Sequence, residues 1–126
     1  MTHARSMLVW LAACIVLPMS AQAEFTMAQY FEYRESKDAE RQKYVEIFVD
    51  GILEGFIAAN LMDARAHRGD FFCPPKTLSV DAQTVNVMID KRFPDPEQRA
   101  KFAETPLSIV VLLELQTAYP CHGTAR

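Results

Sequence analysis

Two cysteines, each beside proline, constrain the fold of this chain more than any other feature. One lies in the segment Phe71-Phe72-Cys73-Pro74-Pro75, and the other ends the segment Ala118-Tyr119-Pro120-Cys121. Proline cannot continue a helix interior, because it lacks the backbone N–H and its ring clashes with the preceding turn. Each cysteine is therefore expected where a helix has ended or has not yet begun. We predict a disulfide between Cys73 and Cys121 that fastens a mid-chain loop to the end of the last helix.

Residues 1–23 resemble a secretory signal peptide. An apolar run from Met7 to Leu17 follows a short basic start, and Ala21-Gln22-Ala23 supplies the small residues that a signal peptidase accepts. Cleavage before Glu24 would leave residues 24–126 as a single domain in the oxidising periplasm. Its even cysteine count favours a disulfide over two unrelated buried thiols.

Cys14 allows a second interpretation of the leader. Leu11-Ala12-Ala13-Cys14 resembles a lipoprotein processing site, and lipidation there would anchor the chain to a membrane. Only about seven apolar residues would then precede the cysteine, which is the bottom of the usual range. Lipid anchoring at Cys14 is therefore the less favoured alternative, and a role as an anchored envelope structural protein depends on it.

The charge balance argues against nucleic acid as a partner. The whole chain has 13 basic and 16 acidic side chains. Loss of Arg5 with the leader would leave twelve basic side chains against the same sixteen acidic ones, a net charge of −4. An acidic chain is repelled by phosphate backbones and by anionic membrane surfaces, whereas it permits a basic protein partner.

Helix start and stop signals recur along the chain and predict an all-α bundle of four or five helices. Thr26, Ser36 or Asp38, Ser79, Asp95 and Thr105 are candidate N-caps, and Gly69 can end a helix in a left-handed conformation. The expected helices are Met27 to Arg34, Ala39 to about Ala66, one after Ser79 that ends before Pro94, Pro96 to about Phe102, and Leu107 to Ala118. A buried parallel strand is the rival interpretation of the apolar run from Ile109 to Leu113.

The long second helix should bury one apolar stripe. Its members recur at spacings of three and four: Tyr44, Phe48, Ile52, Phe56, Ala59 and Met62. Gly51 and Gly55 lie on or beside this stripe. Because glycine inside a helix costs about 1 kcal/mol relative to alanine, we predict that another helix or the chain end packs closely against them. Two tolerated glycines on a solvated side are the alternative.

The sequence offers no catalytic constellation, metal site or cofactor motif. His67 falls in a charged loop and His122 in the C-terminal tail, and there is no His-x-x-x-His, Cys-x-x-Cys or glycine-rich phosphate loop. Asp50 and Glu54 share a helix face, but a solvated acidic surface explains them better than a catalytic pair. We therefore expect a binding protein rather than an enzyme, with no small-molecule substrate.

The arrangement of these motifs resembles the Rap/Tai family of immunity proteins from type VI secretion systems. The resemblance runs from about Tyr44 to Cys121 and rests on Val49-Asp50-Gly51-Ile52 with Gly55-Phe56, Phe72-Cys73-Pro74-Pro75, and Ala118-Tyr119-Pro120-Cys121. It implies a periplasmic all-α protein that inhibits a peptidoglycan amidase delivered by a neighbouring cell, and it allows a homodimer. Relatives carry a second cysteine pair where this chain has Tyr30-Phe31 and Tyr44-Val45, so the first helix should be held by packing alone.

No effector-contact residue of the family aligns with a motif here, so the contact surface is predicted from composition alone. By composition, the best candidate is the end of the long helix, with Arg65, His67, Arg68 and Asp70. An ordinary solvated connection is the alternative for this segment, and residues 91–97 form a competing loop. Three functions stay open: amidase immunity, an acid-stress chaperone of the HdeA-like kind, and an orphan envelope protein of the same fold.

Overall fold

The computed structural model describes residues 24–65 and 69–121, and within these ranges the protein is all-α, as predicted. The helices are α1 (Met27–Arg34), α2 (Ala39–Arg65), α3 (Ala82–Arg92), α4 (Pro96–Lys101) and α5 (Leu107–Ala118). The predicted leader, its cleavage site and Cys14 lie outside the described residues. None of the described helices is long and apolar enough to cross a membrane.

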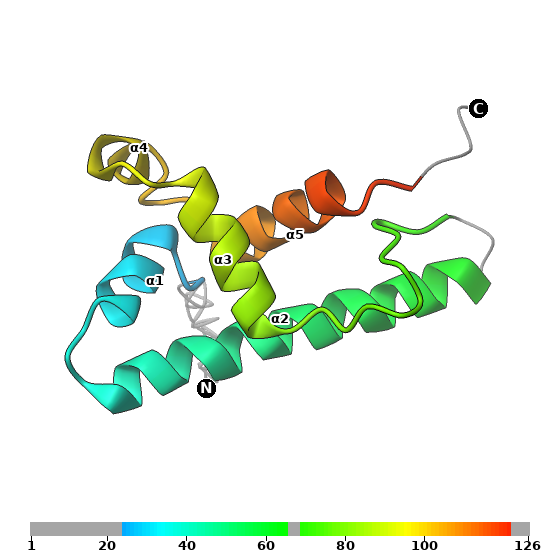
Figure 1. Cartoon of the computed structure of the whole chain (residues 1–126), viewed down its shortest axis with the longest axis horizontal. Helices are drawn as coiled ribbons and strands as arrows, with labels where there is room; N and C mark the ends of the chain where they lie inside the picture. The colour runs from blue at the N-terminus through cyan, green and yellow to red at the C-terminus, as the bar shows by residue number, and fades with distance from the viewer. Residues whose placement is uncertain (1–23, 66–68, 122–126) are drawn as a thin grey trace, which may run out of the picture.

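The long helix α2 forms one side of the molecule, and the other helices pack over it (Figure 1). α1 packs on its first part, α3 and α5 cross each other over its middle, and α4 lies beside α1 at one end. The shared core is apolar and includes Phe25, Tyr30, Val45, Val49, Phe72, Val85, Ile89, Phe93, Val111 and Leu115. The apolar run of α5 is therefore helical, and the strand interpretation is wrong. Val110 and Val111 of this run are buried, whereas Ile109 and Leu113 are half exposed.

The buried stripe of α2 is rotated from the predicted one. Val45, Val49 and Leu53 are its buried residues, whereas Tyr44 is 48% and Met62 60% exposed. Other members of the predicted stripe, Phe48, Ile52 and Phe56, pack at the margin of the core. Further apolar residues of α2, among them Ile47, Ile57 and Leu61, are exposed, so α1, α3 and α5 cover only part of its apolar surface. Spacing alone could not decide which edge is covered.

Contrary to the prediction, nothing in the described part of the chain packs against the two glycines of α2. Gly51 and Gly55 are both exposed, and no described atom outside their own helix lies within 4 Å of where a β-carbon would stand. Gly51 instead lines a shallow apolar hollow with Tyr44, Ile47, Phe48 and Ile52. Within the described residues, the alternative of glycines on an open side of the helix is correct.

The helix starts follow the predicted chemistry in part. Thr26 forms a full capping box with Gln29 at α1, and Asp95 caps α4 ahead of Pro96. Asp38 Oδ1 accepts a hydrogen bond from Glu40 N at the start of α2. Gly69 adopts the predicted left-handed conformation, with φ of 92°.

Two predicted caps are wrong. Asp81 rather than Ser79 caps α3, because its carboxylate accepts hydrogen bonds from both the backbone N–H and the hydroxyl of Thr84. α5 begins after Pro106 without a side-chain cap, so Thr105 does not serve as one. The carbonyl of Thr105 instead accepts a hydrogen bond from Met27 N.

Backbone hydrogen bonds attach the start of α1 to the segment before α5. Met27 N donates to Thr105 O and Ala28 N to Ala103 O, both at 3.0 Å, while Leu107 N donates to Phe25 O at 2.9 Å. The expectation that packing alone would hold α1 is therefore wrong. These main-chain hydrogen bonds and the α1 side chains described below together hold α1 against the rest of the fold.

Candidate functional site

The predicted disulfide is present and closes one end of the molecule. Cys73 and Cys121 are bonded, with their Cα atoms 4.9 Å apart. Cys73 N also donates a 2.8 Å hydrogen bond to the carbonyl of Tyr119, just past the end of α5. The two proline-flanked motifs therefore form one unit that ties the segment after α2 to the last helix.

Asn60 fixes the same segment from the other side. Its Nδ2 donates to the carbonyl of Phe72, and its Oδ1 accepts from the backbone N–H of Phe71, both at 2.8 Å. One side chain thus satisfies two main-chain groups just before the disulfide, while the Phe72 ring is 2% exposed in the core. Asn60 was not among the predicted site residues; a lone amide within the apolar second half of α2 was the available signal.

We call the exposed surface at this end of the molecule the disulfide end, and define it as Arg65, Asp70, Phe71, Cys73 and Cys121. Arg65 is the exposed last residue of α2, Asp70 is exposed beside the disulfide, and the Phe71 side chain is 43% exposed. The structure thus places Arg65 and Asp70 at one end of the molecule, whereas His67 and Arg68 lie outside the described residues.

The competing loop, residues 91–97, is tied closely into the fold. Phe93 is buried, its carbonyl accepts a 2.8 Å hydrogen bond from Arg99 Nε, and Asp95 is engaged as the cap of α4. Lys91 and Glu97 are exposed. The backbone of this loop is therefore anchored to the fold at Phe93 and Asp95.

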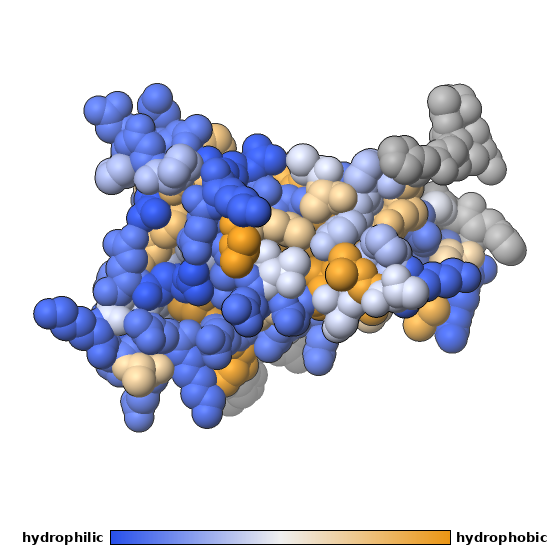
Figure 2. Space-filling view, in the orientation of Figure 1, coloured by the Kyte–Doolittle hydropathy of each residue, from blue (hydrophilic) through white to orange (hydrophobic). Residues whose placement is uncertain are grey.

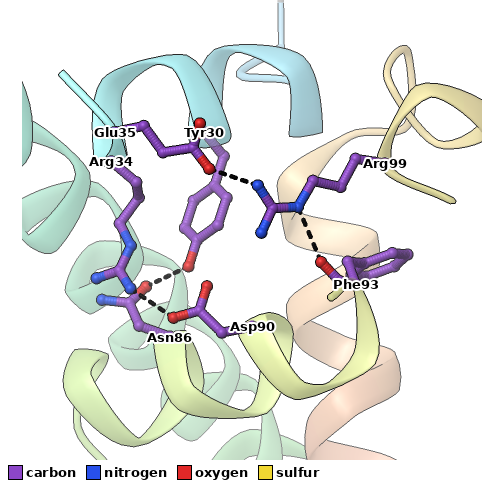
Figure 3. A network of polar contacts seen from close by, with 7 residues as sticks. All are labelled: Tyr30, Arg34, Glu35, Asn86, Asp90, Phe93 and Arg99. Carbon is purple, nitrogen blue, oxygen red and sulfur yellow. Dashed lines mark hydrogen bonds and ion pairs between the residues drawn. The ribbon is translucent and has the colours of Figure 1, made fainter. Parts of the chain in front are cut away.

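A second polar region joins α1 to α3 (Figure 3). The buried Tyr30 hydroxyl donates a 2.8 Å hydrogen bond to Asn86 Oδ1, and Arg34 forms a 2.7 Å ion pair with Asp90. Burial raises the pKa of Tyr30 well above its ordinary value, so the hydroxyl stays protonated and donates. Arg99 extends the region by pairing with Glu35.

Beside this region lies a polar hollow of about 480 Å³ between α1, α2 and α3. Its lining residues are Arg34, Glu46, Asp50, Asp81, Ala82, Gln83 and Asn86, and we call it the acidic hollow. Hydrophilic side chains predominate over this junction of helices on the face shown in Figure 2. Asp50 is more than a solvated surface residue, because its Oδ1 accepts a 3.2 Å hydrogen bond from Ala82 N at the start of α3. No sequence pattern predicted that these residues lie together.

A buried ion pair joins α3 to α5. Glu114 is the one charged residue among the buried positions of the described chain, and its carboxylate pairs with Arg92. Neither residue lines the acidic hollow. Its partner on the neighbouring helix gives it a structural role, because an unpaired buried carboxylate would be strongly destabilising.

The described residues contain no group of three or more histidine, cysteine or acidic side chains that could hold a metal ion. Comparisons of the chain with protein-family models, with curated proteins and with solved structures found no match. The class that the fold defines is a small disulfide-bonded all-α domain. Such a disulfide is typical of compartments outside the reducing cytoplasm.

Proposed function

We propose that this protein is a periplasmic immunity protein that binds and inhibits a type VI-delivered peptidoglycan amidase and has no catalysis of its own. The observation that carries the proposal is the junction of the two motifs on which the family resemblance rests. Cys73 is bonded to Cys121 and donates its N–H to Tyr119, so both motifs contribute to one rigid end of the fold. A shared framework of this kind supports common descent more strongly than two separate cysteines would.

Inhibition of a hydrolase requires tight binding, because each free enzyme molecule continues to turn over. Nanomolar affinity corresponds to about −12 kcal/mol. Aromatic and arginine side chains that are held rigidly supply most of such an energy, since little conformational entropy is lost on binding. At the disulfide end, Phe71 and Arg65 are residues of these types. Asn60 and the disulfide hold the backbone beside Phe71, which favours this end as the contact surface.

The proposal is tested by protection of a susceptible strain. The full chain is expressed with its leader in cells that receive candidate amidases from the same genome in their periplasm. We expect survival with the wild-type chain, and loss of survival with Arg65→Glu combined with Phe71→Ala. Lys37→Glu, an exposed charge reversal between α1 and α2, is the matched control and should still protect.

Two outcomes would contradict the proposal. Protection that persists after deletion of residues 1–23 would place the action outside the periplasm. Absence of protection against every candidate amidase, with the folded chain present in the periplasm, would remove the immunity role. The fold of each variant is checked by circular dichroism, so that a lost contact is distinguished from a lost structure.

A further inference from the structure

We propose that the Cys73–Cys121 disulfide is a site of thiol–disulfide exchange in the folded protein, and that the Asp70 carboxylate makes it select cationic dithiols over anionic ones. Both cysteines are exposed, so a reductant reaches the bond without unfolding the chain. Exposed disulfides are typically the labile ones, whereas buried structural disulfides resist reduction. The inference goes beyond the proposed function and does not depend on an amidase partner.

The backbone around the disulfide is held by contacts that do not need the bond. Asn60 makes two 2.8 Å hydrogen bonds to the main chain of Phe71 and Phe72, and the Phe72 ring is 2% exposed. Cys73 N donates to the carbonyl of Tyr119 at 2.8 Å. Reduction therefore leaves both thiols on segments that stay docked against each other. This arrangement makes exchange in the native fold reversible.

The Asp70 carboxylate lies beside this bond and discriminates between reductants by charge. Its Oδ2 atom is 3.8 Å from Cys73 Sγ, and its carbonyl oxygen is 3.6 Å from Cys121 Sγ. Within residues 24–65 and 69–121, no basic side chain forms an ion pair with Asp70. Since exchange brings a thiolate to the disulfide and produces another, a neighbouring negative charge disfavours it. A cation carried by the reductant offsets this repulsion.

The reaction transfers two electrons from a dithiol to the protein. One sulfur of the reductant, as a thiolate, attacks one sulfur of the disulfide; the Cys73–Cys121 bond breaks, and the other cysteine leaves as a thiolate. The second thiol of the reductant then attacks the mixed disulfide, which frees the first cysteine and closes the disulfide of the reductant. The two protons of the dithiol end on the two cysteines, so the products are a protein dithiol and an oxidised reductant.

The test compares dithiols that differ in charge. The full chain is expressed with its leader, and the exported protein is purified and reduced with dithiobutylamine, which is cationic, or dihydrolipoate, which is anionic. Free thiols are alkylated at intervals and counted by mass spectrometry. Each rate is divided by the rate of the same dithiol with hydroxyethyl disulfide, an uncharged reference. We expect the cationic dithiol to be favoured about threefold to tenfold, since two unit charges about 4 Å apart interact appreciably even in water.

Low urea shows whether the reaction occurs in the folded protein. A urea concentration of about 1 M raises the unfolded fraction roughly fivefold or more. We expect unchanged rates under this condition, together with rates proportional to the dithiol concentration. Rates that rise with the unfolded fraction would mean that the disulfide reacts only after unfolding, and would overturn the proposal.

Matched variants assign the selectivity to one carboxylate. Asp70→Asn keeps the size of the side chain, and it should bring the preference for the cationic dithiol down to that of the reference disulfide. Glu104→Gln removes the same charge from an exposed position at the opposite end of α5 from Cys121, and it should react as the wild type does. Circular dichroism checks that both variants are folded. Equal normalised rates for the two dithiols with the wild type, or equal effects of both variants, would overturn the proposal.

Discussion

The hydroxyl of Tyr30 and the Oδ1 atom of Asn86 are 2.8 Å apart, and this buried hydrogen bond joins α1 to α3 across 56 residues of sequence. It lies beside the Arg34–Asp90 ion pair, which connects the same two helices. The resemblance to the immunity family predicts a cysteine in the first helix, whereas this chain has Tyr30-Phe31 there. Here the aromatic residue and the amide, rather than a second disulfide, help to fix α1.

Replacement of Tyr30 by phenylalanine tests the strength of this connection. Tyr30→Phe keeps the ring but leaves Asn86 Oδ1 buried without a donor, so the free energy of unfolding should fall by about 1–3 kcal/mol. Urea unfolding followed by circular dichroism measures the change. Tyr44→Phe is the control, because the Tyr44 side chain is half exposed and should change the free energy by less than about 0.5 kcal/mol. An equal effect of both replacements would show that the buried hydrogen bond contributes nothing specific.

Alkaline pH should weaken the same connection. Burial raises the folded-state pKa of Tyr30 above its unfolded value, so the folded protein binds this proton more tightly than the unfolded chain does. The associated stability is complete below about pH 10, the ordinary pKa of tyrosine, and is lost as the pH rises above it. The free energy of unfolding, measured at several pH values, should therefore decline more steeply for the wild type than for Tyr30→Phe. Parallel curves would contradict a role for Tyr30 ionisation.

Reduction of the disulfide should be the largest single perturbation. Cys73 and Cys121 are separated by 48 positions, and the chain-entropy estimate for a loop of this size is about 4 kcal/mol. We expect dithiothreitol to lower the free energy of unfolding by an amount of this order. The double variant Cys73→Ala with Cys121→Ala should match the reduced protein and should not respond to dithiothreitol. Two thiols that react with an alkylating agent in the unfolded, unreduced protein would contradict the bond.

The exposed glycines of α2 should tolerate a side chain. Gly51→Ala and Gly55→Ala add a methyl group where no described neighbour lies within 4 Å, so each should raise the free energy of unfolding by up to about 1 kcal/mol. Thermal unfolding provides the measurement. Gly69→Ala should do the opposite, because its φ of 92° is unfavourable for any residue with a β-carbon. A loss of stability at Gly51 or Gly55 would indicate a neighbour that packs against this side of α2.

Local sequence signals predicted much of this fold because their chemistry acts over a few residues. The Thr26 capping box, the Asp95-Pro96 start of α4 and the left-handed Gly69 all depend on groups within one turn of the chain. The disulfide was also predictable, because compartment and cysteine count left few alternatives for Cys73 and Cys121. In each case the stabilising interaction is local or covalent, so knowledge of the packing was not needed.

Features that depend on which surfaces meet could not be predicted from the sequence. α2 has apolar residues beyond its buried stripe, and only its contacts with α1, α3 and α5 determine that Val45 and Val49 are buried while Tyr44 is half exposed. Asn60 was missed because its two partners, Phe71 and Phe72, reach it only after the chain has turned back. The acidic hollow combines residues from three helices, and no spacing along one helix reveals it.

The proposed immunity role is tested most directly by measuring the affinity of purified residues 24–126 for purified cell-wall amidases of the same genome. Isothermal titration calorimetry should give a dissociation constant in the nanomolar range, about −12 kcal/mol, for one amidase. Titration of that enzyme should abolish peptidoglycan cleavage at a stoichiometric ratio. If none of the amidases binds, or if one binds and remains active when saturated, the protein is not an amidase inhibitor.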